Sequence, residues 1–328
     1  MATTDHEALY LHPDRNLAME LVRATEAAAI RAYPFIGRGD KLAADGAAVD
    51  AMRAFLTTVN FDGIVVIGEG EKDKAPMLFN GEHVGNGRGP ACDIAVDPID
   101  GTMLTAQGHQ NALSVIAVAD RGSMLDASSI FYMDKLVAGP EGVGVLDISR
   151  PIGDNIRALA KAKGKEVEDI RVAILDRPRH VGLIQEIRDA GAGTRLLLDG
   201  DVAGGINAAR YETRIDMCVG IGGSPEGIVT ACAIKALGGF IQGVLKPGND
   251  EERQRGIDAG LKMDYVYSAD ELVRGDNTMF VATGVTDGGL VAGVRKKGPI
   301  IRTESIVMRG RSGTIRRVIA DHLVEKWL

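Results

Sequence analysis

The chain has 328 residues, 45% of them hydrophobic, which favours two domains or one large layered domain with an ample core. Its formal net charge of −7 argues against a nucleic acid or an anionic membrane surface as partner, because phosphates attract basic patches. A small phosphorylated substrate remains compatible with this charge, since bound cations reverse the local potential.

Three cysteines, Cys92, Cys218 and Cys232, are widely spaced and show no metal-binding spacing, which predicts a reduced, cytoplasmic setting. The segment Met1–Glu7 is polar and acidic, without the basic start and apolar core of a secretory signal. No apolar run approaches the roughly 20 residues that span a bilayer. We therefore expect a soluble protein without a membrane partner.

The first half of the chain mixes helices and strands. Leu17, Leu21, Ala24 and Ala28 repeat at helical spacing and predict a helix over 14–32. A loop over 37–41 precedes a second helix that begins at Asp45. A buried strand over 64–67, a glycine-rich loop over 81–89, and strands over 93–96, 112–119 and 130–137 follow.

From Pro151 onward, strands and helices alternate, which is typical of an α/β layer. Two β-rich pieces near the end, 303–308 and 314–319, are expected to pair. The other predicted helices are 155–163, 181–189, 202–209 and 225–237, and the other strands 172–175, 195–198, 217–219, 240–244 and 279–283.

The run Asp97-Pro98-Ile99-Asp100-Gly101-Thr102 follows the apolar strand 93–96. Its two carboxylates, three residues apart on a proline-containing turn, suit a hard cation such as Mg²⁺, and Thr102 lies within reach of a metal-bound water. This equipment is typical of metal-assisted phosphate ester hydrolysis. A turn without chemistry is the alternative for this segment taken alone.

Three further acids stand beside glycine or proline at element ends, where α/β sheets bind ligands. Asp45 is interpreted either as a helix N-cap or as part of this acidic set. Glu69 lies between Gly68 and Gly70 after a strand, as either a solvated charge or a ligand-facing group. Glu226 begins a helix, where it either interacts with the helix dipole or accompanies a phosphate together with a cation.

Arg177 and Arg179 follow the strand 172–175, and two guanidinium groups there can bind a phosphate, although a solvated basic loop is the alternative. Asp199 and Asp201 follow the next strand and could accept hydrogen bonds from sugar hydroxyls, or Asp201 could cap the following helix. Together these residues predict a phosphorylated sugar or polyol as substrate.

The run 97–102 (DPIDGT) resembles the signature of the lithium-sensitive, Mg²⁺-dependent sugar and inositol phosphatase superfamily. A fuller set of motifs, extending from about Asp14 to His322, resembles class II fructose-1,6-bisphosphatase more narrowly. The motifs are 37–41 (GRGDK), 44–46 (ADG), 67–71 (IGEGE) with 75–78 (APML), 177–180 (RPRH), 199–203 (DGDVA) and 220–227 (GIGGSPEG).

This resemblance implies hydrolysis of the 1-phosphate of fructose 1,6-bisphosphate, a gluconeogenic step, with Mg²⁺ or Mn²⁺ as cofactor. It implies a catalytic set of Thr102, Asp45 and Glu69, in which Thr102 and Asp45 orient and deprotonate the attacking water. The implied metal ligands are Asp45, Glu69, Asp97, Asp100 and Glu226. The implied substrate contacts are Asp100, Gly101, Thr102, Tyr132, Arg177, Pro178, Arg179, Asp199, Gly200, Asp201 and Gly223.

The implied fold is the sugar-phosphatase fold, an α/β (α+β) protein built as an α-β-α-β-α sandwich of two sheet-containing subdomains, in a homo-oligomer (dimer or tetramer). Residues 1–150 are predicted to form the metal-binding catalytic subdomain and 151–290 the substrate-binding subdomain. Residues 291–328 are predicted to be a β-rich segment that returns to the sheet. Asp100, often Glu in this family, and Met103 depart from the pattern and bear on metal preference.

Two alternatives remain open. The same chemistry could act on sedoheptulose 1,7-bisphosphate or an inositol phosphate, because the motifs constrain the phosphate and the metal better than the rest of the sugar. A non-catalytic phosphosugar sensor would need the glycine turns and arginines, but neither Thr102 nor the full acidic set.

Overall fold

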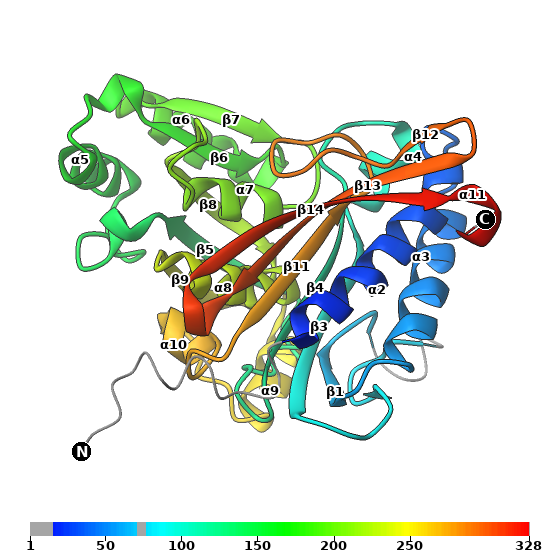
Figure 1. The fold of residues 1–328 in the computed structure, drawn as a ribbon. Coiled ribbons are helices and arrows are strands. Elements are labelled where there is room, and N and C mark those ends of the chain that lie inside the picture. Colours follow the sequence, from blue (N-terminus) through cyan, green and yellow to red (C-terminus); the bar gives the residue numbers. More distant parts are fainter. Residues whose placement is uncertain (1–15, 71–76, 328) are drawn as a thin grey trace, which may run out of the picture.

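The computed structural model describes residues 16–70 and 77–327, so Glu71, Ala75, Pro76 and the start of the first predicted helix lie outside the described residues. Two sheets organise the chain (Figure 1). The eight-stranded sheet has the order β12-β13-β11-β4-β3-β1-β2, with β14 paired to β13. Its strands are β1 (Asp62–Ile67), β2 (His83–Val84), β3 (Ala91–Asp100), β4 (Leu113–Asp120), β11 (Met279–Gly284), β12 (Arg295–Lys297), β13 (Ile300–Arg309) and β14 (Thr314–Leu323).

The six-stranded sheet has the order β10-β9-β5-β8-β6-β7. Its strands are β5 (Tyr132–Ala138), β6 (Arg171–Leu175), β7 (Gly193–Leu197), β8 (Met217–Gly223), β9 (Phe240–Lys246) and β10 (Tyr267–Ser268). The helices are α2 (Leu17–Ala32), α3 (Lys41–Leu56), α4 (Thr102–Gln107), α5 (Ile152–Lys163), α6 (Val181–Asp189), α7 (Val202–Ala208), α8 (Ser224–Leu237), α9 (Asp250–Asp258), α10 (Ala269–Leu272) and α11 (Val324–Trp327).

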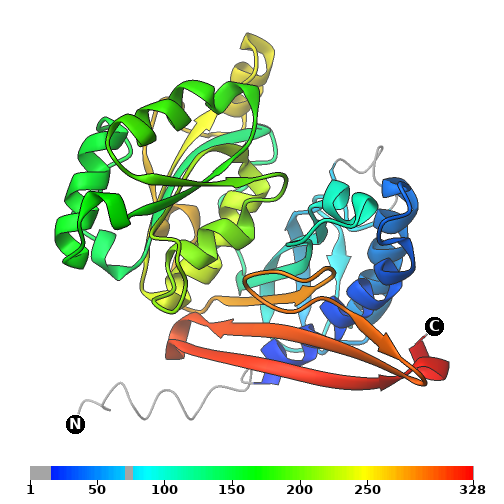
Figure 2. The ribbon, with the colours of Figure 1, turned by 90° about the horizontal axis from the view of Figure 1, so that it is seen from above.

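Helices and sheets alternate in five layers, as Figures 1 and 2 show. Three apolar cores fill the four interfaces between these layers, because one core extends across both faces of the central helices. Helices α2 and α3 pack on one face of the eight-stranded sheet, and α7 and α8 fill the space between the two sheets. Helices α5 and α6 cover the outer face of the six-stranded sheet. The predicted α-β-α-β-α sandwich is therefore confirmed, and coverage of both sheet faces explains the nearly continuous burial of β4, β6 and β11.

Sheet membership crosses the segment boundaries expected from the sequence. Strand β5 precedes residue 150 but belongs to the six-stranded sheet, whereas β11 precedes residue 291 but belongs to the eight-stranded sheet. Strands β13 and β14 pair in antiparallel register from Ile300↔Leu323 to Arg309↔Thr314, so the expected pairing of the two C-terminal strands is confirmed. The division into three functional segments stays a prediction.

Two local predictions were wrong. Helix α3 begins at Lys41, and Asp40 is its N-cap, accepting a hydrogen bond from the Ala43 amide at 3.0 Å; Asp45 instead lies one turn inside the helix. Pro98 does not form a turn after a strand but lies within β3, where the register against β4 shifts between Asp97 and Asp100. This bulge accommodates the proline, which has no amide proton for the ladder.

Candidate active site

Parallel pairing brings the first acidic side chains to one sheet edge. Strands β1 and β3 run parallel, with Ile67 opposite Ala95, so Glu69 and the Asp97–Asp100 segment emerge at the same carboxyl end. The bulge in β3 re-aims these side chains at that edge. Asp100 is 3% exposed, whereas Asp97 and Glu69 are partly buried. The two sequence motifs therefore meet in space.

Helix α8 delivers Glu226 in its first turn. A Cβ at Gly223, the residue preceding the helix, would lie 1.8 Å from Glu226 Oε2, so only glycine leaves room for this carboxylate. Likewise, a Cβ at Gly200 would lie 2.6 Å from Asp100 Oδ1. These two glycines, predicted as substrate contacts, thus make space for the carboxylates of the acidic set.

The five predicted metal ligands influence one another electrostatically. Burial, followed by the carboxylates of Asp100, Glu69, Glu226 and Asp45, raises the pKa of Asp97 well above its ordinary value. Burial, Asp45 and Glu226 raise the pKa of Glu69 to about 7. Mutual repulsion of this kind requires that the carboxylates lie close together in a poorly solvated place, which is typical of functional sites.

Burial alone raises the pKa of Asp45. For Asp100, burial is the largest cause of a strongly raised pKa, followed by the charges of Glu226 and Asp201. Burial also raises the pKa of Glu226, an effect that the Lys135 ammonium opposes. Each acid of the set is therefore more easily protonated than a solvated carboxyl.

Sequence reasoning missed Lys135. This lysine, on β5, is 5% exposed; its Nζ lies 2.5 Å from Asp201 Oδ2 and donates a hydrogen bond to the Gly223 carbonyl at 3.1 Å. Burial lowers its pKa, but Asp201 and Glu226 outweigh that effect and raise it above the ordinary value. The signal in the sequence was a lone lysine inside the otherwise largely apolar strand 130–137.

The acidic set fits a hard divalent cation by its chemistry. Among residues 16–70 and 77–327, no group of three or more His, Cys, Asp or Glu side chains is already arranged to hold a metal ion. However, Asp100 Oδ2 and Glu226 Oε2 are buried without a hydrogen-bond partner in the described part of the chain. Buried, unpaired carboxylate oxygens are costly unless something coordinates them, and oxygen donors are what Mg²⁺ and Mn²⁺ accept.

A cavity of about 280 Å³ opens beside these acids. Glu69, Asp97 and Glu226 line it together with the aromatic ring of Phe131, which is 64% exposed. Phe131 and Ser128, also in the lining, were not predicted; they follow no motif and enter the site only because β5 begins at this edge. A small substrate therefore has access to the acidic set.

Thr102 is the first residue of α4, directly after the acidic run. Gly101 caps this helix in the left-handed conformation, with φ of 89°, which glycine adopts without strain. The half-buried Thr102 thus follows Asp100 through a sharp change of direction, and Met103, the departure noted in the sequence, is 41% exposed.

The two arginines differ in what they bind. Arg177 donates to Asp199 Oδ1 at 2.7 Å and to the Leu198 carbonyl at 2.6 Å, so it ties the end of β6 to the end of β7. Arg179 donates through Nε and Nη2 to the Ile221 carbonyl and lies over the Tyr132 ring, 5.0 Å from its centre. Within the described residues, Nη1 of Arg179 has no hydrogen-bond partner, whereas both Nη atoms of Arg177 have one.

The predicted sugar-binding acids are likewise partnered, Asp199 by Arg177 and Asp201 by Lys135. Asp201 is the N-cap residue of α7 but makes no side-chain capping hydrogen bond. Pro178 begins a short 3-10 helix over Pro178–His180. The site is thus braced by internal ion pairs.

His180 joins the two strand ends that carry these groups. Its Nδ1 lies 2.8 Å from the Leu175 carbonyl, and its Nε2 accepts from the Ile221 amide at 2.8 Å. These partners fix the tautomer with the proton on Nδ1, and burial lowers its pKa. The ring therefore holds β6 and β8 in register beside Arg179.

Comparison with known proteins agrees with this geometry. Residues 15–322 match the family described as bacterial fructose-1,6-bisphosphatase, glpX-encoded. Three proteins are each 46% identical over 325 residues, covering 95% of this chain and 96% of the relative. They are fructose-1,6-bisphosphatase 1 class 2 of Escherichia coli (strain K12) and the class 2 fructose-1,6-bisphosphatases of Escherichia coli O6:H1 and Shigella flexneri. The chain belongs to the class II, glpX-encoded bacterial fructose-1,6-bisphosphatases.

Proposed function

We propose that this protein hydrolyses the 1-phosphate of fructose 1,6-bisphosphate to give fructose 6-phosphate and phosphate. The observation that carries the proposal is the convergence of five carboxylates beside Thr102, where burial and the charges of the other four raise the pKa of Asp97. Membership of the class II family, over nearly the whole chain, supports the choice of substrate.

We propose Asp45, Glu69, Asp97, Asp100 and Glu226 as the residues that hold Mg²⁺ or Mn²⁺. When bound, such a cation neutralises phosphate charge and stabilises the charge that develops on the leaving oxygen. The unpaired Asp100 Oδ2 and Glu226 Oε2 support this assignment.

Thr102 orients the attacking water, whose proton passes toward Asp45. Burial raises the pKa of Asp45, so its carboxylate accepts a proton more readily than a solvated aspartate. Glu69 is the third member of the proposed catalytic set, and burial, Asp45 and Glu226 raise the pKa of its carboxyl to about 7 in the metal-free protein. Attack by water is direct, so no covalent intermediate is needed.

The substrate side is provided by the six-stranded sheet. Strands β6, β7 and β8 are parallel neighbours, and Tyr132 on β5 pairs with Gly223 at the end of β8. Arg179, held between the Ile221 carbonyl and the Tyr132 ring, supplies a free guanidinium nitrogen for phosphate. The adjoining part of the site is held by two ion pairs, Arg177 with Asp199 and Lys135 with Asp201.

A substrate panel tests the proposal. Phosphate release is measured from fructose 1,6-bisphosphate, sedoheptulose 1,7-bisphosphate and inositol 1-phosphate, with Mg²⁺, with Mn²⁺ and with chelator. We expect metal-dependent release that favours the fructose ester. Preference for another ester would assign that ester as the substrate. If the folded protein released no phosphate from any ester with metal present, a phosphosugar sensor would be favoured. Inhibition by Li⁺ would place the chain in the wider lithium-sensitive superfamily.

We further propose a cytoplasmic homo-oligomer, a dimer or tetramer. The edge strand β14 exposes Ile315, Ile319 and Leu323, which are 42, 64 and 48% exposed and recur at every fourth residue. A second copy would cover such an edge. Light scattering of wild type and Ile319→Lys tests this. None of the described helices is long and apolar enough to cross a bilayer.

A further inference from the structure

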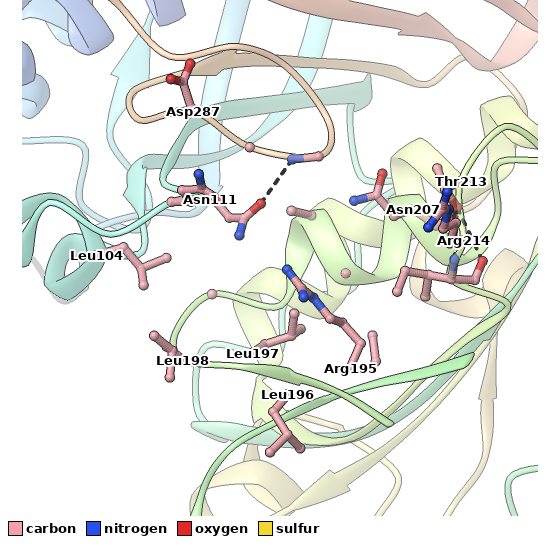
Figure 3. A pocket seen from close by; sticks show the side chains of 18 of the residues that line it. Leu104, Asn111, Arg195, Leu196, Leu197, Leu198, Asn207, Thr213, Arg214 and Asp287 are labelled. Carbon is pink, nitrogen blue, oxygen red and sulfur yellow. Dashed lines mark hydrogen bonds between the residues drawn. The ribbon is translucent and has the colours of Figure 1, made fainter. Parts of the chain in front are cut away.

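A larger cavity, of about 950 Å³, lies between the two sheets, outside the acidic set (Figure 3). One wall comes from β7 and α7 with the segment that follows α7. The other comes from Leu104 and residues 109–111 after α4, and from the loop 287–289 after β11. A volume of this size accommodates a small metabolite.

Two positive charges in the lining have no partner. Arg195 and Arg214 are exposed, and neither makes a hydrogen bond or ion pair within the described residues. Figure 3 shows the Arg195 side chain extending into the space between Asn111 and Asn207, with Arg214 on the Asn207 side. Two guanidinium groups supply planar, paired donors for a phosphate.

The acids of the lining are already neutralised. Asp199 pairs with Arg177 at 2.7 Å, and Glu212 pairs with Arg210. Asp287 pairs with Arg295 at 3.0 Å and accepts from the Gly293 amide; Figure 3 shows its carboxylate directed away from the cavity. The fourth arginine of the lining, Arg317, pairs with Glu304 at 2.7 Å. The unbalanced charge is therefore positive, which favours an anion.

The cavity is contiguous with the candidate active site. Asp199 in its lining holds Arg177, and Gly200 lies against the Asp100 carboxylate. On the opposite wall, Leu104 lies two residues after Thr102 in the same helix. A ligand that contacts both walls would therefore shift residues adjacent to the reacting groups.

We propose that this cavity binds a phosphomonoester metabolite through Arg195 and Arg214, and that its occupancy alters the kinetics of hydrolysis. The amide side chains of Asn111 and Asn207 would bond the polar part of the ligand, and Leu197 would pack against its apolar part. Binding itself does not depend on the proposed function, whereas the kinetic coupling rests on it.

Calorimetric titration tests the binding, with glycerol 3-phosphate and adenosine 5′-monophosphate as probes of different size in Mg²⁺ buffer. We expect at least one probe to bind wild type. The double variant Arg195→Gln/Arg214→Gln should bind that probe about tenfold or more weakly. Arg316→Gln, which removes another exposed charge, on β14 outside the lining, should leave probe binding unchanged. Arg179→Ala should also retain probe binding, because Arg179 lies in the candidate active site.

The coupling is tested by steady-state kinetics. The bound probe should change kcat or KM of wild type at least about twofold, and the double variant should have wild-type basal kinetics but no response to the probe. Absence of binding by both probes, or binding that survives the double substitution, would overturn the site. Binding without a kinetic response in an active enzyme would overturn the coupling alone.

Discussion

The ammonium group of Lys135 lies 2.5 Å from Asp201 Oδ2, and both side chains are at least nine-tenths buried. The pair stands beside the acidic set, where the lysine lowers the pKa of both Glu226 and Asp100 against the larger effect of their burial. One cation from β5 thus offsets part of the repulsion among carboxylates that come from other elements.

Lys135→Met should destabilise the protein by about 3–5 kcal/mol, because it leaves Asp201 as an unpaired buried charge. Chemical denaturation at a fixed Mg²⁺ concentration measures the loss. Lys161→Met, at an exposed position on α5, is the control and should change stability by less than about 0.5 kcal/mol. A Lys135→Met protein as stable as wild type would show that the pair has no structural role.

Thr102→Ala should lower kcat on the order of 10²-fold or more while KM changes little, because the proposed role of its hydroxyl is to orient the attacking water. Steady-state phosphate release gives both constants. Thr102→Ser, which keeps the hydroxyl, should retain most of the activity. Unchanged turnover in the alanine variant would remove Thr102 from the mechanism.

Substitution of Arg177 and Arg179 should separate phosphate binding from structural stabilisation. Arg179→Ala should raise KM about tenfold or more with little effect on kcat, since it removes the proposed ground-state contact with phosphate. Arg177→Ala should mainly lower the melting temperature, because Arg177 joins β6 to β7 through Asp199 and the Leu198 carbonyl. The reverse pattern would exchange the roles of the two residues.

The metal-free protein should become less stable as pH rises from about 4.5 to about 7. The Glu69 carboxyl has a pKa of about 7 in the folded chain against an ordinary 4.5, so the folded state binds its proton more tightly and loses that advantage as the proton leaves. This difference in the pKa of Glu69 corresponds to a loss of at most about 3 kcal/mol in the free energy of unfolding. In calorimetry with chelator, Glu69→Gln should have a higher melting temperature than wild type at pH 8 and the same melting temperature as wild type at pH 4.5. A difference that does not vary with pH would contradict this account.

Much of the site was predictable because its residues sit in strong local patterns. Glu69 follows an apolar strand between glycines, and Glu226 begins a helix at a Gly-Gly-Ser-Pro turn, so the element ends were evident from the sequence. Their convergence with Asp97 rests on the parallel pairing of β1 and β3, which local pattern does not encode.

The errors arose where tertiary contacts override local preference. Pro98 suggested a turn, but the sheet continues through it by means of a bulge. Asp45 resembled a cap because glycine follows it, yet the residue that caps the helix is Asp40, which lies within the predicted loop 37–41. Helix α9, capped by Asn249, was not predicted because its sequence is almost entirely polar. The Lys135–Asp201 pair joins residues 66 positions apart, a separation beyond any local pattern.

The central claim is that the converged carboxylates hold the metal ion that hydrolysis requires. The most direct measurement is the initial rate of phosphate release from fructose 1,6-bisphosphate by wild type and Asp97→Asn across a Mg²⁺ titration, with chelator as the zero point. The account predicts no release in chelator, a saturating response of wild type to Mg²⁺, and little or no recovery by the variant. Equal rates for the two proteins, or release by wild type in chelator, would contradict it.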